Sequence, residues 1–474
     1  MKDLLSHLEA YASSDFYPMH MPGHKRNHNW RMPNPYSIDI TEIENFDNLH
    51  HAEGILKQGM ERTAKLFGSK RSFHLVNGST VGILAGILSL TRKGDTVLMA
   101  RNCHKAVYHA LILNELNPLY LTPPYEEGFS LNGSISPESV KSQLQNNPQV
   151  KLVVITSPSY EGVVSDIREI ADICHEKNVP LFVDEAHGAH LGFSEKFPQS
   201  ALSQGADLVV QSFHKTLPSL TQTAVLHIGT ERVSGEKVER KLAILETSSP
   251  SYVLMGSIER CISILAAQKE ELFQAWFQKL EGFHEQTKIL EKFRVLGYGK
   301  ERNHLPSSIH AFDPSKLVIS TKGTNFTGGK LADFLRKNMR IEPEMISADY
   351  IVAMTSLCDT HEGMDRLAKG ILAADKRAGQ GDSEKHTIKK IPTLKIQMTP
   401  AQAEEAESQI IPWKESKGEI SKDFVFAYPP GIPIVAPGEE LSTEIIGIVE
   451  SLKESGVKVE VSGKENNNIA VIKR

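Results

Sequence analysis

The chain has few cysteines, little net charge and no long apolar run, and each of these absences excludes a class of function. Its 474 residues include four cysteines, far apart and without a CxxC pair, so neither a zinc site nor a disulfide framework is expected. Lysine and arginine number 53 against 58 aspartates and glutamates, which leaves no basic surface for nucleic acid or an anionic membrane. No segment reaches the roughly 18 apolar residues of a membrane span. We expect a cytoplasmic protein with a small substrate and no metal, membrane or nucleic-acid partner.

Short β-rich runs alternate with helical patterns in the first half of the chain. One such helix is predicted after Asp166, a candidate N-cap, because isoleucines recur at 167, 170 and 173. Alternation of this kind is typical of βαβ units, and we expect an α/β fold with a mainly parallel sheet and helices on both faces. The expected strands are DTVLMA from 95, PLYLTP from 118, KLVVITSP from 151, PLFVDEAH from 180 and DLVVQSFH from 207.

The length of the chain predicts more than one domain. A helical pattern without proline runs from about 258 to 293, long enough to leave one domain and enter another. The only long charge-rich polar stretch, near 375–390, is typical of a linker. The expected parts are an N-terminal segment 1–40, a large domain 41–290, a small α+β domain 291–375, a linker 376–390 and a C-terminal α+β domain 391–474.

Reactive side chains gather where the predicted strands end. Ligands of an open parallel sheet bind outside the carboxyl ends of its strands, so we expect these side chains to share one site. They are Ser157, Asp184, His187, Ser212, His214 and Lys215.

Lys215 follows a buried strand, where a charged amine is costly unless it reaches solvent or is used chemically. His214 before it, and Asp184 on the preceding strand, favour a Schiff base between Lys215 and pyridoxal phosphate, with Asp184 keeping the pyridine nitrogen protonated. VDEAHGAH also resembles a helicase acidic box, but no GxxxxGK[ST] phosphate loop is present. His187 with His190 forms no metal pair, because no third ligand is evident.

The phosphate of such a cofactor needs hydrogen-bond donors. VNGSTVG places Gly78, Ser79 and Thr80 at the start of an apolar helix whose free N–H groups attract an anion, although an ordinary N-cap fits that sequence equally well. Ser212 and His214 can add donors. His104 begins another helix, where it is either a solvated histidine or a ring that covers the cofactor.

SFHKTLPSLTQTA resembles the pyridoxal-phosphate attachment signature of the bacterial ornithine/lysine/arginine decarboxylases. Six further segments stand in the order that the family shows: MPGHKR, SIDITEIENFDNLHHAEGILKQ, VNGSTVG, RNCHKAV, VDEAHGAH and TSSPSY. The resemblance covers residues 17–375 well and the C-terminus more loosely. The resemblance implies a fold-type-I enzyme of the aspartate-aminotransferase kind, a homo-oligomer with its active site at a dimer interface. It assigns catalytic roles to Lys215, Asp184 and His104. It assigns cofactor contacts to Gly78, Ser79, Thr80, His104, Asp184, His187, Ser212, His214, Lys215, Thr247 and Ser248, of which Thr247 or Ser248 would reach the partner subunit's phosphate group.

The family resemblance further implies a lyase that removes the α-carboxylate of a basic amino acid in polyamine biosynthesis. The motifs begin within the first 25 residues, as in the short biosynthetic form, so we expect a dimer or tetramer and arginine as substrate, with lysine or ornithine next. Candidates to hold the distal cation are Glu42, Glu44, Asp47 and Glu439. A different reaction on the same fold, such as transamination, and a non-catalytic pyridoxal-binding protein remain the alternatives.

Overall fold

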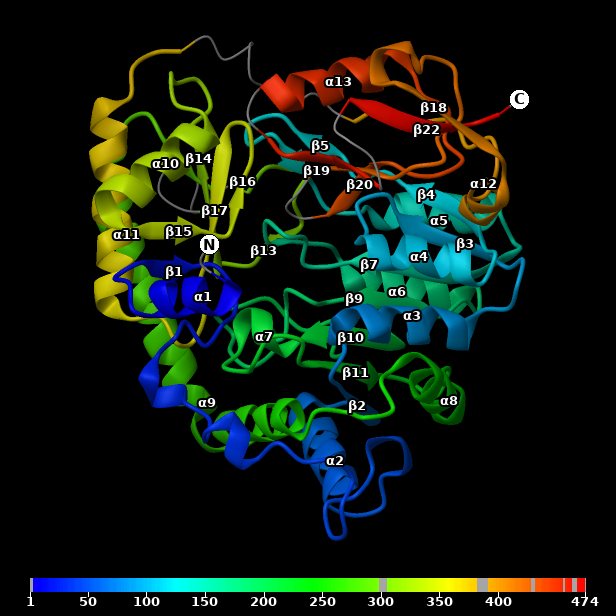
Figure 1. The fold of residues 1–474 in the computed structure, drawn as a ribbon, viewed down its shortest axis with the longest axis horizontal. Helices are drawn as coiled ribbons and strands as arrows, with labels where there is room; N and C mark the ends of the chain where they lie inside the picture. The colour runs from blue at the N-terminus through cyan, green and yellow to red at the C-terminus, as the bar shows by residue number, and fades with distance from the viewer. Residues whose placement is uncertain are drawn as a thin grey trace.

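The computed structural model describes residues 3–297, 305–381, 391–427, 431–454, 457–462 and 467–473. These form a large domain around one wide sheet, a small domain beside it and a unit of residues 391–473, here called the C-terminal unit, that lies against the large domain (Figure 1). No helix in these ranges has the length and apolar character that a bilayer crossing requires.

The large domain is built on a seven-stranded sheet. Neighbouring strands are parallel except at β11, which is antiparallel to both of its neighbours. The five predicted runs all form strands, and the prediction of a mainly parallel sheet is confirmed; the antiparallel strand was not predicted. In spatial order the strands are β2 (Arg71–Leu75), β11 (Ala224–Ile228), β10 (Leu208–Ser212), β9 (Leu181–Asp184), β7 (Val150–Thr156), β3 (Thr96–Ala100) and β4 (Asn117–Leu121).

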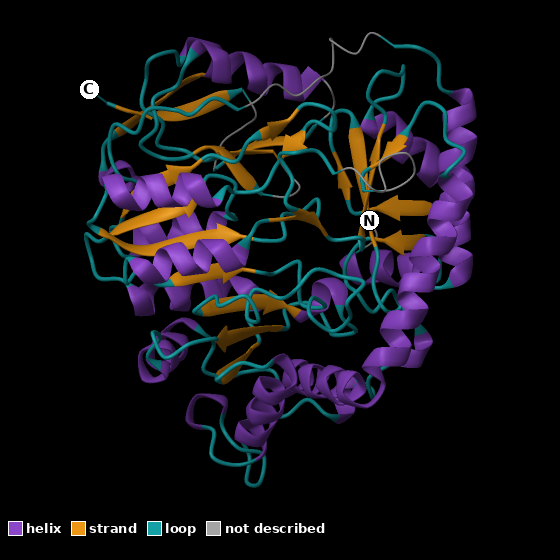
Figure 2. Cartoon of the chain, turned by 180° about the vertical axis from the view of Figure 1, so that it is seen from behind, coloured by secondary structure: helices purple, strands orange, loops and turns teal. Residues whose placement is uncertain are grey.

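Helices cover both faces of this sheet (Figure 2). The helices α3 (Gly78–Leu90), α4 (Lys105–Leu113) and α8 (Gly235–Leu245) pack together, and α5 (Pro137–Asn146) packs on α6 (Ile167–Glu176). Connections between parallel strands are right-handed as a rule, and the strand order reverses its direction across the sheet after β4, which places α5 and α6 on the face opposite α3 and α4. The predicted cap of α6 is confirmed, because the Asp166 carboxylate accepts a hydrogen bond from the Glu169 N–H.

The long helix α9 (Tyr252–Thr287) connects the two domains. It packs on α2 (Ile55–Phe67) in the large domain and on α11 (His361–Arg377) in the small one. The expected span of about 258–293 was wrong at both ends. Ser251 caps the helix by accepting a hydrogen bond from the Leu254 N–H, and residues 288–293 turn into strand β12.

The small domain contains a four-stranded antiparallel sheet with two helices on it. The predicted α+β pattern is confirmed. Its strands are β12 (Arg294–Val295), β14 (Lys316–Ser320), β17 (Tyr350–Met354) and β16 (Met345–Ile346), and its helices are α10 (Gly328–Met339) and α11. Shorter pairs are β5 (Tyr125–Glu126) with β6 (Leu131–Asn132) and β8 (Val163–Val164) with β13 (Ala311–Phe312).

The N-terminal segment belongs structurally to the small domain. After α1 (Leu4–Ala12), strand β1 (Tyr17–Met19) pairs in parallel with β15 (Ile341–Pro343). The following Gly23 donates its N–H to His214 O at 2.6 Å and accepts a hydrogen bond from Ser356 Oγ at 2.6 Å. A Cβ at position 23 would lie 2.6 Å from Leu217 O, so only glycine allows this approach. The MPGHKR segment thus joins the turn that carries Lys215 to the small domain.

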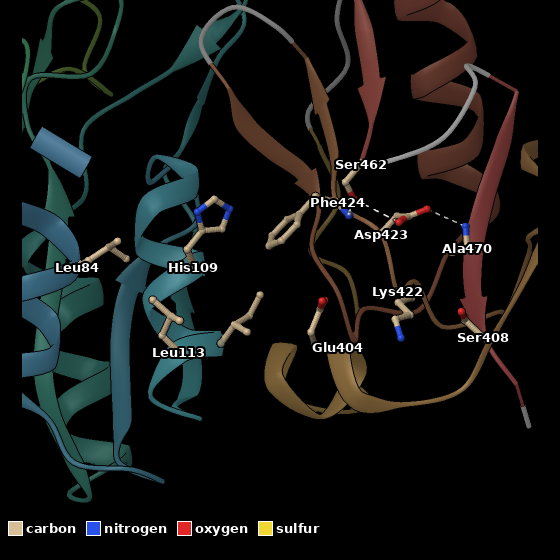
Figure 3. Close-up of a pocket in the computed structure, with 11 residues that line it drawn as sticks. Leu84, His109, Leu113, Glu404, Ser408, Lys422, Asp423, Phe424, Ser462 and Ala470 are labelled. Carbon is tan, nitrogen blue, oxygen red and sulfur yellow. Dashed lines mark hydrogen bonds between the residues drawn. The ribbon is translucent and has the colours of Figure 1, made fainter. Parts of the chain in front are cut away.

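The C-terminal unit has its own apolar core. The predicted linker falls partly outside the described residues, at 382–390, as does the start of YPPGIPIVAPGE, and the domain boundaries stay predictions. A cavity of about 670 Å³ lies between part of this unit and the helices α3 and α4 (Figure 3). Its elements are α12 (Pro400–Glu405), β18 (Ser408–Pro412), β19 (Val425–Ala427), β20 (Ile432–Val435), α13 (Thr443–Glu454), β21 (Val459–Val461) and β22 (Asn468–Ile472).

Candidate active site

The carboxyl ends of β3, β7, β9 and β10 meet at one edge of the large sheet. Asp184 is the last residue of β9, and Lys215 lies on α7 (Phe213–Thr216), directly after β10. His104 follows β3. Ser157 follows β7 and donates its N–H to Asp184 O at 3.0 Å, while its hydroxyl accepts a hydrogen bond from the Ser165 N–H. Ser157 therefore supports the loops of the site.

Lys215 has its amine beside an imidazole. Its Nζ lies 2.9 Å from His187 Nε2. Burial lowers the pKa of Lys215, and the carboxylates of Asp184 and Glu344 oppose that shift. A lowered pKa raises the fraction of neutral amine, which is the form that attacks an aldehyde.

Asp184 is a buried carboxylate, 3% exposed, that accepts a hydrogen bond from the Ala186 N–H at 3.1 Å. Burial raises the pKa of Asp184, and the positive charge of Lys215 opposes the rise. A carboxylate in such surroundings gains most from a nearby cation, since the cation offsets the cost of its burial.

Three histidines surround the amine as neutral imidazoles. Burial lowers the pKa of His104 to about 3 and that of His214 to about 4, and it holds the pKa of His187 well below its usual range. The charge of Lys215 adds to each shift. His104 caps α4, where its Nδ1 accepts a hydrogen bond from the Ala106 N–H at 3.2 Å. The proton of its neutral ring is therefore on Nε2.

The start of α3 has no side-chain cap. Gly78 has a φ of +73°, in the left-handed region, and Asn77 before it makes no side-chain capping bond. Ser79 is half-buried and Thr80 is exposed. The exposed Thr247 donates its N–H to Asn77 Oδ1 of the same chain at 3.2 Å, so TSSPSY, which includes the exposed Ser248, lies beside this turn.

These groups fit pyridoxal phosphate. The amine suits the aldehyde, the buried carboxylate suits the ring nitrogen, and the uncapped helix start suits the phosphate. The hydroxyl of Ser212 is buried without a hydrogen-bond partner in the described part of the chain, as a donor for an absent anion would be. By contrast, no cluster of three metal-binding side chains occurs among the described residues, and His190 bonds to Asp313.

Sequence reasoning missed Tyr160, Glu344 and Lys316. The Tyr160 ring lies 4.5 Å from the His187 ring, centroid to centroid, and its hydroxyl donates to Glu344 Oε1. Lys316 is fully buried and donates to His187 O at 3.3 Å and to Asp313 Oδ2 at 3.1 Å. Tyr160 could have been found from its place after a strand, and Lys316 as a charge inside an apolar strand.

The carboxylates suggested for the distal cation differ in availability. Glu42 and Glu44 are exposed. Asp47 organises its own loop, because its oxygens accept four backbone N–H bonds between residues 48 and 56. Glu439 is paired with Arg101 at 3.0 Å. Asp47 and Glu439 are therefore already committed to structural bonds.

Comparison with known proteins points to one enzyme family. Residues 3–362 match the major domain of the Orn/Lys/Arg decarboxylases, and residues 382–461 match their C-terminal domain. The arginine decarboxylase of Halalkalibacterium halodurans is 30% identical, over 99% of this chain and 96% of that protein.

Solved structures share the fold. The lysine decarboxylase LdcF of Francisella novicida superposes with a TM-score of 0.80 at 19% identity, covering 99% of this chain and 80% of that one. The ureidoglycine–glyoxylate aminotransferase of Bacillus subtilis gives 0.58 at 14% identity, over 78% and 95%. The expected fold type I is confirmed. The chain belongs to the Orn/Lys/Arg decarboxylase family and is a pyridoxal-phosphate-dependent carboxy-lyase.

Proposed function

We propose that the chain decarboxylates arginine to agmatine and CO2, as a cytoplasmic step of polyamine biosynthesis. The observation that carries this choice is the 30% identity, over nearly the whole of both chains, to a protein named arginine decarboxylase. Lysine is the second candidate, because a lysine decarboxylase shares 22% identity over 94% of this chain.

Each residue of the site has a proposed part in holding the cofactor. Lys215 would bind it covalently, Asp184 would face the ring nitrogen, and His104 would cover the ring with His187 beside it. Phosphate donors would be Gly78, Ser79, Thr80, Ser212 and His214. Bound pyridoxal phosphate accepts the electron pair of the Cα–carboxylate bond.

The chain's own residues then supply the proton that the α-carbon needs after CO2 has left. Loss of CO2 leaves the α-carbon short of one proton, which a nearby acid must supply. Lys215 Nζ is proposed as that acid. His187 Nε2 lies 2.9 Å from Nζ, so the neutral imidazole can accept a hydrogen bond from the amine and orient it. The buried imidazoles exclude water around this transfer, which favours protonation from a fixed donor over random exchange.

We expect CO2 release to be fastest with arginine when arginine, lysine and ornithine are supplied at equal concentrations. The released amine should be agmatine, identified by mass. Cadaverine or putrescine as the main product would overturn the substrate, and no CO2 from any of the three amino acids would overturn the reaction in this protein.

Glu344 is proposed to hold the distal cation of the substrate. Its oxygens accept hydrogen bonds from Tyr160 Oη and from the Met21 N–H, and its charge opposes the lowering of the Lys215 pKa by burial. We expect Glu344→Gln to raise KM for arginine about 10-fold or more, the effect of losing a charge-assisted hydrogen bond. Glu342→Gln is the matched control, because Glu342 pairs with Arg336 on the half-exposed surface. Equal KM values in both variants would contradict this role.

We further propose that Thr247 or Ser248 completes the site of a partner subunit. Both residues are exposed in the single chain, as residues awaiting a partner would be. Inactive Lys215→Ala subunits, mixed with inactive subunits altered at both 247 and 248, should regain activity approaching one intact site in four. No recovery, after mass spectrometry has shown subunit exchange, would argue for sites built within one chain.

A further inference from the structure

Arg101 lies where the large domain meets the C-terminal unit. Its guanidinium donates to Tyr108 Oη and Pro433 O, each at 2.7 Å, to Ile434 O at 3.1 Å and to Glu439 Oε2 at 3.0 Å. Three of these four acceptors belong to the C-terminal unit. One side chain directly after β3 therefore donates most of its hydrogen bonds to residues more than 300 positions away in the sequence.

The same arginine is hydrogen-bonded to Tyr108 across the chain segment that carries His104. Tyr108, fully buried in α4, donates its hydroxyl to Arg101 O at 2.8 Å while it accepts from the guanidinium. His104 lies between these two residues, as the N-cap of α4. The path of the chain from 101 to 108, and with it the origin of the imidazole, is thus tied to the position of the Arg101 side chain.

The buried charge of the Glu439 carboxylate depends on its ion pair with Arg101. Its side chain is 1% exposed and the Arg101 side chain is 13% exposed. Burial raises the pKa of Glu439, and the charge of Arg101 opposes that rise. Oε2 also accepts from the Ala436 N–H at 2.8 Å. A buried ion pair of this kind fixes geometry, since loss of either partner leaves the other as an unpaired buried charge.

Apolar and aromatic contacts, together with α12, make the rest of the interface along α4. Phe424 meets the rings of Tyr108 and His109 edge to face, with centroids 6.1 and 5.8 Å apart. Beside this contact lies the cavity of about 670 Å³, whose lining includes both His109 and Phe424 (Figure 3). Arg101, Tyr108 and Glu439 form a hydrogen-bonded attachment at the end of α4 that bears His104.

We propose that the Arg101–Glu439 ion pair is the device by which the C-terminal unit positions His104 in the active site. Arg101 and Glu439 are positioning residues that act through the 101–108 loop. This inference rests on the proposed role of His104 at the cofactor. It gives the C-terminal unit a task in catalysis, although none of the proposed cofactor contacts comes from that unit.

The first test compares Glu439→Gln, Arg101→Met and the double variant with Glu450→Gln. Glu450 is the control because its ion pair with Lys414 lies within the C-terminal unit. We expect kcat to fall about 10-fold in Glu439→Gln with little change in KM for arginine, because misplacement of a group at the reacting centre affects turnover first. The double variant should be no slower than Arg101→Met, since the two residues act in series.

The second test uses the protein without cofactor. Hydrogen–deuterium exchange of the amides in residues 101–113 should be faster in Glu439→Gln than in wild type, and unchanged in Glu450→Gln. Glu439→Gln keeps the shape of the side chain, so it remains informative if Arg101→Met does not fold. Unchanged exchange in Glu439→Gln, or multiplying losses of kcat in the double variant, would overturn the positioning role. An inactive wild type would instead count against the proposed function, which the exchange measurement does not require.

Discussion

Replacement of Lys215 by alanine is expected to lower the rate of CO2 release by ~10³-fold or more. The variant loses the amine that would bind the cofactor and the acid that would return a proton to the α-carbon. Reconstituted Lys215→Ala should also lack the visible absorption of lysine-bound cofactor.

The matched control is Lys70→Ala, in which the lost amine belongs to an exposed ion pair with Glu231. Its turnover and absorption should equal those of the wild type, because exposed pairs of this kind contribute little. Substantial CO2 release by Lys215→Ala would require another residue to do the chemistry assigned to this lysine.

Asp184→Asn is expected to keep the cofactor and to lose about 10²- to 10³-fold in kcat. An amide cannot offset a positive charge on the ring nitrogen as a buried carboxylate does, so stabilisation is lost where charge develops. Cofactor content, from absorption of the denatured protein, and kcat should be measured on the same sample.

The neighbouring Glu185 gives the control for Asp184. It is also buried, and burial raises its pKa to about 7, but its oxygens accept bonds from Ser200, the Ala201 N–H and Gln211. Glu185→Gln should therefore change stability more than turnover per folded molecule. A similar loss of kcat in both variants would assign the effect to the loop after β9 rather than to Asp184.

The sequence predicted the large sheet well because strands buried on both faces are almost continuously apolar. The same reasoning located Lys215 and Asp184, since each ends or follows such a strand and a charged residue there stands out. It predicted neither β11 nor β2 as a strand, and AVLHI would in any case look the same in a parallel or an antiparallel neighbour. Strand direction depends on how the turn after Lys215 returns, which composition does not record.

Contacts between distant segments were beyond the same reasoning. Tyr160 meets Glu344 across 184 positions, and Arg101 meets Glu439 across 338. Glu439 shows the limit clearly. As an isolated acidic residue in a recognised segment it suggested a substrate contact, whereas its real partner could be identified only once the C-terminal unit was placed against β3.

The attachment of MPGHKR to the turn of Lys215 bears on how the enzyme is made on the ribosome. Gly23 touches His214 and Ser356 at once, so the turn acquires its native contacts only when residues from the first tenth and the last third of the chain have come together. A nascent chain that has emerged only as far as α9 contains the whole large sheet but lacks Ser356 and β15. Its N-terminal segment lacks its strand partner β15 and the bond from Ser356 until roughly 70 more residues are added at about 5–20 residues per second. Completion of the surroundings of Lys215 is therefore a late event of synthesis, several seconds after the lysine itself has left the ribosome.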